Sequence, residues 1–239
     1  MVQQNSSMNI GEIKQQLAKK TVEFRTGGFK PGDAATESWI GNVYLYKEAE
    51  EIPLNSEGDV MYPLLQLHVA SLPYIPEALK NTAVITVFVG YDEPIDSHTP
   101  QGDGWVLREY TAADQLVVKR WVHPEPLFKT YPLKPGNAED DFPVWDDPAF
   151  PSAIITAIET LEEKEEISNY YDAVNLHYHH KLGGYPSFQQ AHNGFDEGFE
   201  FMFQIAPDDK AGWPIEDDNN LYFTKNAQTG EWKVYAEYD

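Results

Sequence analysis

The chain has 239 residues, of which 41% are hydrophobic and 13% aromatic, with 17 basic residues against 39 acidic ones. This composition excludes a disordered or collagen-like chain and is typical of a globular protein that buries a sizeable core. The formal net charge of −22 argues against binding to nucleic acid or anionic membranes, and favours a basic protein as partner. The acidic residues occur in short clusters, such as residues 139–141, that are typical of a solvated surface.

Two further absences in the sequence limit the chemistry and the location. Without cysteine, the chain has no disulfide, no thiol nucleophile and no thiolate metal ligand. No apolar run approaches the roughly 20 residues of a membrane-spanning helix, and the first 20 residues lack the apolar region of a cleaved signal. We therefore expect a cytoplasmic protein without a membrane-spanning segment.

The first half of the sequence predicts mainly strands. Residues 8–20 have apolar side chains at helical spacing and predict a short helix, and prolines favour a second helix start at 72–79. Strands are expected, from their β-branched and aromatic content, at residues 21–25, 39–46, 64–69, 83–89, 105–110 and 115–121.

The second half predicts a long connection, one clear helix and three strands. Residues 123–151 are rich in proline and have few periodic apolar residues, which predicts an irregular connection. An apolar stripe opposite glutamates predicts a helix at 152–169, and strands are expected at 199–205, 221–224 and 232–235. The pattern as a whole predicts an α+β fold of antiparallel sheets with a few helices.

The two halves of the chain share an ordered set of landmarks. Each half has a glycine pair, then an apolar strand that contains one glutamine, and later a tryptophan that opens a strand. We therefore predict one compact domain, 1–239, with pseudo-repeat halves at 1–122 and 152–239 joined by 123–151. The matching glutamines are Gln66 and Gln204. An unpaired buried amide costs about 1–3 kcal/mol, so we expect each to bond the loops of its own half.

Residues 177–190 (HYHHKLGGYPSFQQ) form the densest group of chemically useful side chains. A ligand-facing site here would add Gln204 from the following strand. The glycine pair has a structural alternative, because glycines before Tyr-Pro suit a tight turn packed by an aromatic ring. The candidate binding residues are His179, Lys181, Gly183, Gly184, Tyr185, Gln189 and Gln204.

Three histidines in this stretch could ligate a metal. On a strand, His177 and His179 would point to the same side, and His180 could add a third imidazole to a zinc- or nickel-type site. His192 or a nearby carboxylate is a further candidate ligand. The alternative, which the absence of a HExxH pattern favours, is a set of hydrogen-bonded structural histidines, and no cofactor is expected.

Five short motifs of the chain form a recognisable combination: residues 61–66 (MYPLLQ), 104–110 (GWVLREY), 180–186 (HKLGGYP), 203–205 (FQI) and 221–223 (LYF). Together they resemble the YwqG-like family, a bacterial domain of unknown function. Residues 213–217 (WPIED) depart from the Trp-Gly-Asp-like turn of similar proteins. The resemblance implies an α+β fold with antiparallel sheets and an internal duplication, and it implies no catalytic residues.

The sequence leaves three functional hypotheses. The first is a non-enzymatic, acidic protein-binding module; the resemblance adds that similar proteins occur in toxin and immunity gene neighbourhoods, which suggests neutralisation of a basic toxin. The second is a small-molecule-binding or hydrolytic enzyme with a pocket between the halves, lined by His179, Tyr185, Gln189 and Gln204. The third is a structural or assembly role.

Overall fold

The chain folds mainly into β-structure. The computed structural model describes residues 8–30, 32, 34–90, 99–102, 104–145, 147–190, 193–213 and 220–236. Over these residues the chain has twelve strands, three α-helices and two 3-10 helices. The α+β prediction is therefore wrong, because strands dominate and the α-helices have only 8, 12 and 4 residues.

The elements follow one another along the chain as follows. Seven strands come first: β1 (Lys19–Arg25), β2 (Ser38–Ile40), β3 (Leu45–Lys47), β4 (Tyr62–Leu67), β5 (Thr82–Val89), β6 (Trp105–Thr111) and β7 (Leu116–Val118). Five follow: β8 (Tyr131–Asp141), β9 (Lys181–Gly183), β10 (Phe199–Ile205), β11 (Leu221–Asn226) and β12 (Trp232–Ala236). The helices are α1 (Ile10–Leu17), α2 (Ser152–Glu163) and α3 (Tyr170–Ala173), with 3-10 turns at Val69–Ser71 and Glu77–Leu79.

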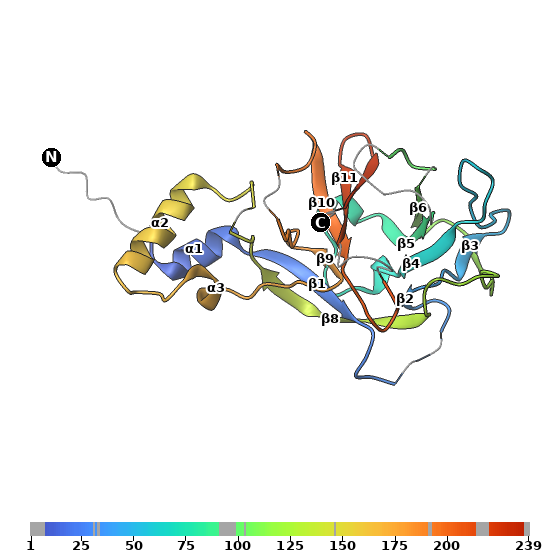
Figure 1. The fold of residues 1–239 in the computed structure, drawn as a ribbon, viewed down its shortest axis with the longest axis horizontal. Coiled ribbons are helices and arrows are strands. Elements are labelled where there is room, and N and C mark those ends of the chain that lie inside the picture. Colours follow the sequence, from blue (N-terminus) through green and yellow to red (C-terminus); the bar gives the residue numbers. More distant parts are fainter. Residues whose placement is uncertain are drawn as a thin grey trace.

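Ten strands form one antiparallel sheet in the order β12-β11-β10-β9-β1-β8-β2-β4-β5-β6, and β3 pairs with β7 (Figure 1). The order has two matching sets of five strands that meet at the β1–β8 pair. β1 precedes β2 in the chain but lies against β9, whereas β8 precedes β9 but lies against β2. A duplication in which the first strand of each half, β1 or β8, pairs with the other half would produce this arrangement. The duplication itself stays a prediction.

Strand β8 overturns the expectation of an irregular connection over the whole of 123–151. It is an 11-residue strand, and it pairs with β2 at its start and with β1 over the rest of its length. Proline is tolerated because Pro135 lies opposite Phe24, where the register of the β1–β8 ladder shifts and a backbone donor is not needed. Proline content alone therefore concealed a central strand.

Two other predicted elements end early for local reasons. The expected strand 39–46 divides into β2 and β3 at Gly41, which has φ 74°, and a side chain there would collide with the carbonyl of Lys129. The expected helix 152–169 ends at Glu163 with Lys164 as its C-cap, because Glu165 takes the left-handed conformation with φ 57°. By contrast, β10 has the predicted bounds.

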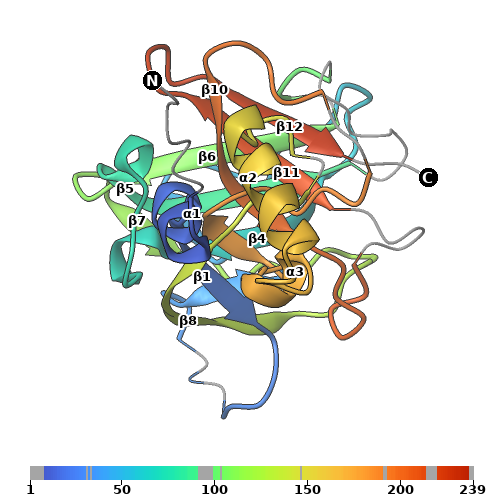
Figure 2. The same cartoon turned by 90° about the vertical axis from the view of Figure 1, so that its left-hand side faces the viewer.

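The helices gather at one end of the sheet and have their own small core (Figures 1 and 2). A capping box begins α1, in which the Asn9 side chain accepts from the Glu12 N–H and the Glu12 carboxylate accepts from the Asn9 N–H. One face of α1 then packs against the apolar stripe of α2. The buried side chains of this core include Ile13, Leu17, Ile154, Ile158, Leu161 and Tyr170.

The sheet curls so that its two edge strands approach each other. Glu109 on β6 accepts hydrogen bonds from Lys225 Nζ on β11 (2.7 Å) and from Trp232 Nε1 on β12 (3.0 Å). Lys225 also donates to the carbonyl of Ala78, and Thr82 donates to Glu109. With the two edges close together, one large buried apolar cluster contains side chains from both sets of strands.

We predict that Glu109→Gln lowers the free energy of unfolding by about 1.5–3 kcal/mol, since it removes charged hydrogen bonds between the two edges. Burial raises the pKa of Glu109, but the bonds from Lys225, Thr82 and Trp232 outweigh burial and leave it lowered. This stabilisation is present above the unfolded-state pKa and is lost as the pH falls through the folded-state pKa. Denaturant unfolding at several pH values measures both effects.

The control for this experiment is Glu77→Gln, which removes an exposed carboxylate whose side chain is 82% accessible and pairs with Lys80. We expect it to change stability by less than about 1 kcal/mol. Equal losses in the two variants would contradict the role of Glu109 in holding the edges together.

Candidate functional site

A buried ion pair lies at the centre of the stretch that the sequence singles out. Lys181 Nζ is 2.8 Å from Asp141 Oδ2, and the two side chains are 2% and 0% exposed. The same ammonium donates to the carbonyl of His177. Burial lowers the pKa of Lys181, and the charge of Asp141 opposes that shift. Lys181, which the sequence suggested as a ligand-facing residue, is therefore occupied inside the protein.

The glycine pair wraps around the carboxylate of this ion pair. Gly183 and Gly184 have φ of 77° and 74°, and a side chain on Gly184 would collide with Asp141. The N–H of Tyr185 then donates to Asp141 Oδ2 at 2.9 Å. The geometry matches the structural-turn alternative for this pair.

Asp141 is a residue that sequence reasoning missed. It stood in an acidic cluster, residues 139–141, that we expected to be solvated, yet it is completely buried. Two features of the sequence could have indicated that Asp141 is buried. Asp141 directly precedes the apolar segment 142–145, and Lys181, a possible partner, directly precedes Leu182.

The two buried glutamines bond the loops as expected. Gln204 accepts from the N–H of Ser187 and donates to the carbonyls of Tyr178 and His179. Gln66 makes the corresponding set of bonds in the first half, with backbone groups of Ala35, Glu37, Tyr44 and Leu45. Gln204 therefore holds the histidine-bearing loop in place, and its amide faces the protein interior.

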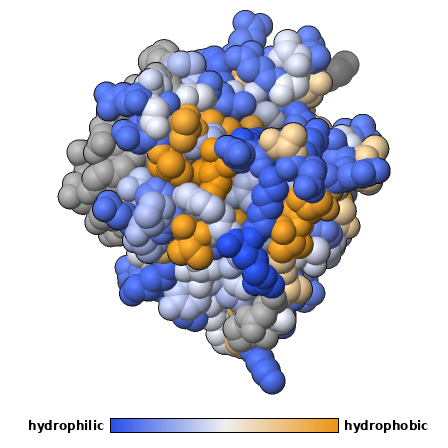
Figure 3. All heavy atoms as spheres, turned by 90° about the vertical axis from the view of Figure 1, so that its right-hand side faces the viewer, coloured by the Kyte–Doolittle hydropathy of each residue, from blue (hydrophilic) through white to orange (hydrophobic). Residues whose placement is uncertain are grey.

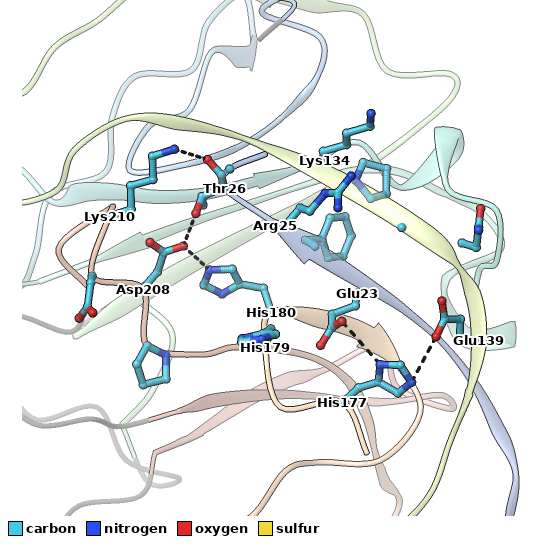
Figure 4. A pocket seen from close by; sticks show the side chains of 17 residues that line it. Glu23, Arg25, Thr26, Lys134, Glu139, His177, His179, His180, Asp208 and Lys210 are labelled. Carbon is cyan, nitrogen blue, oxygen red and sulfur yellow. Dashed lines mark hydrogen bonds and ion pairs between the residues drawn. The ribbon is translucent and has the colours of Figure 1, made fainter. Parts of the chain in front are cut away.

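A groove of about 850 Å³ lies where the two sets of strands meet (Figure 4). Its walls are the end of β1, the first part of β8, the loop 177–180 and the loop 207–210. His177, His179 and His180 all line it, as do Glu23 and Asp208 among the acidic residues. This groove is the candidate functional site.

His180 is fixed by bonds at both ring nitrogens. Its Nδ1 accepts from the N–H of Ala206 (3.1 Å), so Nε2 carries the proton and faces Asp208 Oδ2 at 3.2 Å. Burial raises the pKa of Asp208, but hydrogen bonds from His180, the Ala211 N–H and Thr26 outweigh it and lower the pKa to about 2. His180 and Asp208 form a rigid wall of the groove.

His177 lies between two carboxylates. Its Nδ1 is 3.6 Å from Glu23 Oε2, and its Nε2 is 3.8 Å from Glu139 Oε2 (Figure 4). The contact with Glu23 raises the pKa of His177, and burial opposes this by a smaller amount. The pKa of Glu23 is lowered in turn, chiefly by His177. An imidazolium at this position bridges β1 and β8.

The three histidines are not arranged as a metal site. His177 and His180 face carboxylates on different sides of the groove, and His179 is exposed. Within the part of the chain that the structure describes, no group of three histidine or carboxylate side chains is placed to hold a metal ion. His192, the further candidate ligand, lies outside the described residues, as do residues 214–219 of the departing motif.

The remaining candidates lie in separate places. Gly183, Gly184 and Tyr185 border a second groove of about 860 Å³, where the Tyr185 hydroxyl donates to the carbonyl of Leu17. His179 and Gln189 border a smaller hollow of about 450 Å³. The structure therefore does not bring His179, Tyr185, Gln189 and Gln204 into one pocket.

Two basic residues in the main groove were also missed from the sequence. Arg25, near the end of β1, lies directly opposite Lys134 on β8, and both side chains are exposed in the groove. Their juxtaposition depends on the register of two strands more than 100 residues apart, which no local pattern reveals.

An apolar hollow of about 520 Å³ lies at the end of the molecule opposite the helices. Figure 3 shows this end, where apolar side chains gather between hydrophilic ones. Leu54, Val118 and Val122 are 53%, 48% and 71% exposed. The hollow is lined by Tyr46, Ile52, Leu54, Val60 and Trp121, with Glu50, Glu51, Lys119 and Arg120.

We predict that Lys181→Met and Asp141→Asn each lower the free energy of unfolding by about 3–5 kcal/mol, since each leaves a buried polar partner unpaired. Equilibrium unfolding in denaturant measures the loss. Lys20 and Asp140 provide the control, because they form a neighbouring exposed pair 2.7 Å apart. Lys20→Gln should cost about 0–1 kcal/mol. A cost as small as this for Lys181→Met would contradict the buried pair.

We also predict that Glu23→Gln lowers the pKa of His177 in an NMR titration. Because the folded-state pKa is raised above the ordinary value of 6.5, the stabilisation is complete below that value. It is lost as the pH rises through the folded-state pKa, and the Glu23→Gln variant should lose most of this dependence. An unchanged His177 titration in the variant would show that Glu23 is not its partner.

No helix among the described residues combines the length and apolar character needed to cross a membrane.

No curated protein matches the chain. The sequence profile of a family described as "Domain of unknown function (DUF1963)" matches residues 39–229, which is most of the chain. The chain therefore belongs to the DUF1963 family.

Proposed function

We propose that this DUF1963 protein is a non-enzymatic, YwqG-like binding module that recognises a basic partner protein. The supporting observation is the apolar hollow at the end of the molecule that carries β3 and β7, where Glu48 and Glu51 are exposed. Contiguous exposed apolar surface on a soluble protein commonly marks an interaction site. The net charge of the whole chain, −22, favours partners of the opposite sign.

Two cations near the hollow, Lys119 and Arg108, bond the backbone, and Arg120 lies over the ring of Tyr44. Lys119 Nζ donates to the carbonyls of Glu48 and Glu50, and Arg108 donates to the carbonyl of Glu51. The carboxylates of Glu48 and Glu51 have no ion-pair partner among the described residues, and both residues are exposed. The loop therefore presents negative charge beside an apolar surface in a fixed conformation.

This arrangement suits a partner that places an apolar anchor in the hollow and basic side chains on its rim. Interfaces commonly have this anatomy, with a desolvated apolar centre and a polar border. The net charge of −22 would speed association with a basic partner at low salt. The YwqG-like resemblance gives the concrete form of the proposal, which is neutralisation of a basic toxin.

The alternative is a small-molecule-binding or hydrolytic protein. The groove at the β1–β8 junction favours small-molecule binding, since it lies between the two sets of strands and is lined by histidines and charged residues. His180 and Asp208 are fully engaged with each other and with the backbone, which does not suit a general base. The geometry therefore supports binding better than hydrolysis.

We predict that the double variant Glu48→Lys, Glu51→Lys weakens binding to a basic partner by about tenfold or more, mainly through slower association. The measurement is calorimetry and surface plasmon resonance with the protein encoded by the neighbouring gene. Glu163→Lys on α2, at the far end of the molecule, is the matched charge control (Figure 1). Absence of binding at micromolar concentrations, or equal loss in the control, would contradict the proposal.

A further inference from the structure

The charges along the β1–β8 ladder are complementary except at the groove. Lys19 lies opposite Asp141, and Lys20 lies opposite Asp140 with an ion pair of 2.7 Å. At the other end of the ladder, Arg25 lies opposite Lys134. Like charges directly opposite each other in an antiparallel pair destabilise it. Arg25 and Lys134 therefore lie together in a protein that has more than twice as many acidic as basic residues.

Nothing in the described chain neutralises these two cations. Neither Arg25 nor Lys134 has an ion pair with a described residue, and Lys134 Nζ lies 5.7 Å above the ring of Phe29. Both residues line the groove, and their side chains lie near each other (Figure 4). The pair therefore presents about two positive charges to whatever occupies the groove.

The nearby carboxylates already have other partners. Glu23 and Glu139 lie on either side of His177, at 3.6 and 3.8 Å. Asp208 accepts from Thr26, from His180 and from the backbone N–H of Ala211. Glu23, Glu139 and Asp208 thus face histidines, Thr26 or the backbone, Asp209 lies in the loop that carries Lys210, and none of the four forms an ion pair with Arg25 or Lys134.

A third cation lies beside the same turn. Lys210 Nζ donates to the carbonyl of Thr26, the residue after Arg25, at 2.7 Å. Gly27 lacks a side chain where a Cβ would lie 3.4 Å from that ammonium, which leaves room for the approach. The groove, at about 850 Å³, has the size of known small-molecule sites.

We propose that this groove binds a small molecule through a phosphate monoester group, held by Arg25 and Lys134. A phosphate dianion matches the two uncompensated charges, and the guanidinium can donate two parallel hydrogen bonds to its oxygens. Such binding would remove the repulsion between the two side chains. The remainder of the ligand would extend toward His177 and His179, which line the same groove.

Titration with inorganic phosphate at constant ionic strength, followed by the amide NMR signals of Gly27 and Gly136, tests the proposal. We expect saturable shifts in the wild type, and Arg25→Gln or Lys134→Gln should weaken binding about tenfold or more, as expected for loss of a charged hydrogen bond. Lys20→Gln is the matched control, because it removes a cation from the same ladder that faces an acid. It should bind phosphate as the wild type does.

A charge-repair variant separates binding from folding. Lys134→Glu should raise the melting temperature of the phosphate-free protein, because an acid then faces Arg25, and it should abolish phosphate binding. Titration with succinate tests the alternative of a carboxylate ligand. Three results would overturn the proposal: no saturable shift with phosphate in the millimolar range, phosphate binding by the Arg25→Gln and Lys134→Gln variants as tight as that of the wild type, or preference for succinate over phosphate.

Discussion

The buried ion pair between Lys181 and Asp141 is the constraint on which the central part of the structure depends. Asp141 ends β8 and Lys181 begins β9, so the pair fixes the later strands against the central β1–β8 ladder. Two charges in the interior are tolerated because they are paired and also bonded to backbone groups. Asp141 accepts from the Tyr185 N–H and Lys181 donates to the carbonyl of His177, so the pair also sets the loop between those residues.

The fixed loop explains why the charged groups of the groove have separate roles. His177 contacts Glu23 and Glu139, and His180 donates a hydrogen bond to Asp208 on the other wall, so both histidines act as structural groups of the groove. Among the described residues, Arg25 and Lys134 have no ion-pair partner, although the protein is strongly acidic. At the far end of the molecule, Lys119 and Arg108 bond backbone carbonyls, and Glu48 and Glu51 are exposed.

Local sequence patterns predicted most strands, including β10 with its observed bounds, and the backbone bonding of Gln66 and Gln204. Local patterns failed for features that depend on contacts between distant parts of the chain. β8 was concealed by its prolines, of which the sheet accommodates Pro135 at a register shift, and this helped to make the α+β prediction wrong. The burial of Asp141 and the juxtaposition of Arg25 with a lysine depend on strand register, which composition and periodicity do not reveal.

Native-state hydrogen exchange of the wild-type protein tests the central claim most directly. The amides of Tyr185 and Ser187 donate to Asp141 and Gln204, the two side chains that hold the loop. If the buried network fixes the loop, these amides should exchange only through global unfolding, with the same opening free energy as the core of β5 and β10. Exchange of Tyr185 and Ser187 through a low-energy local opening, while those strands stay protected, would contradict the account.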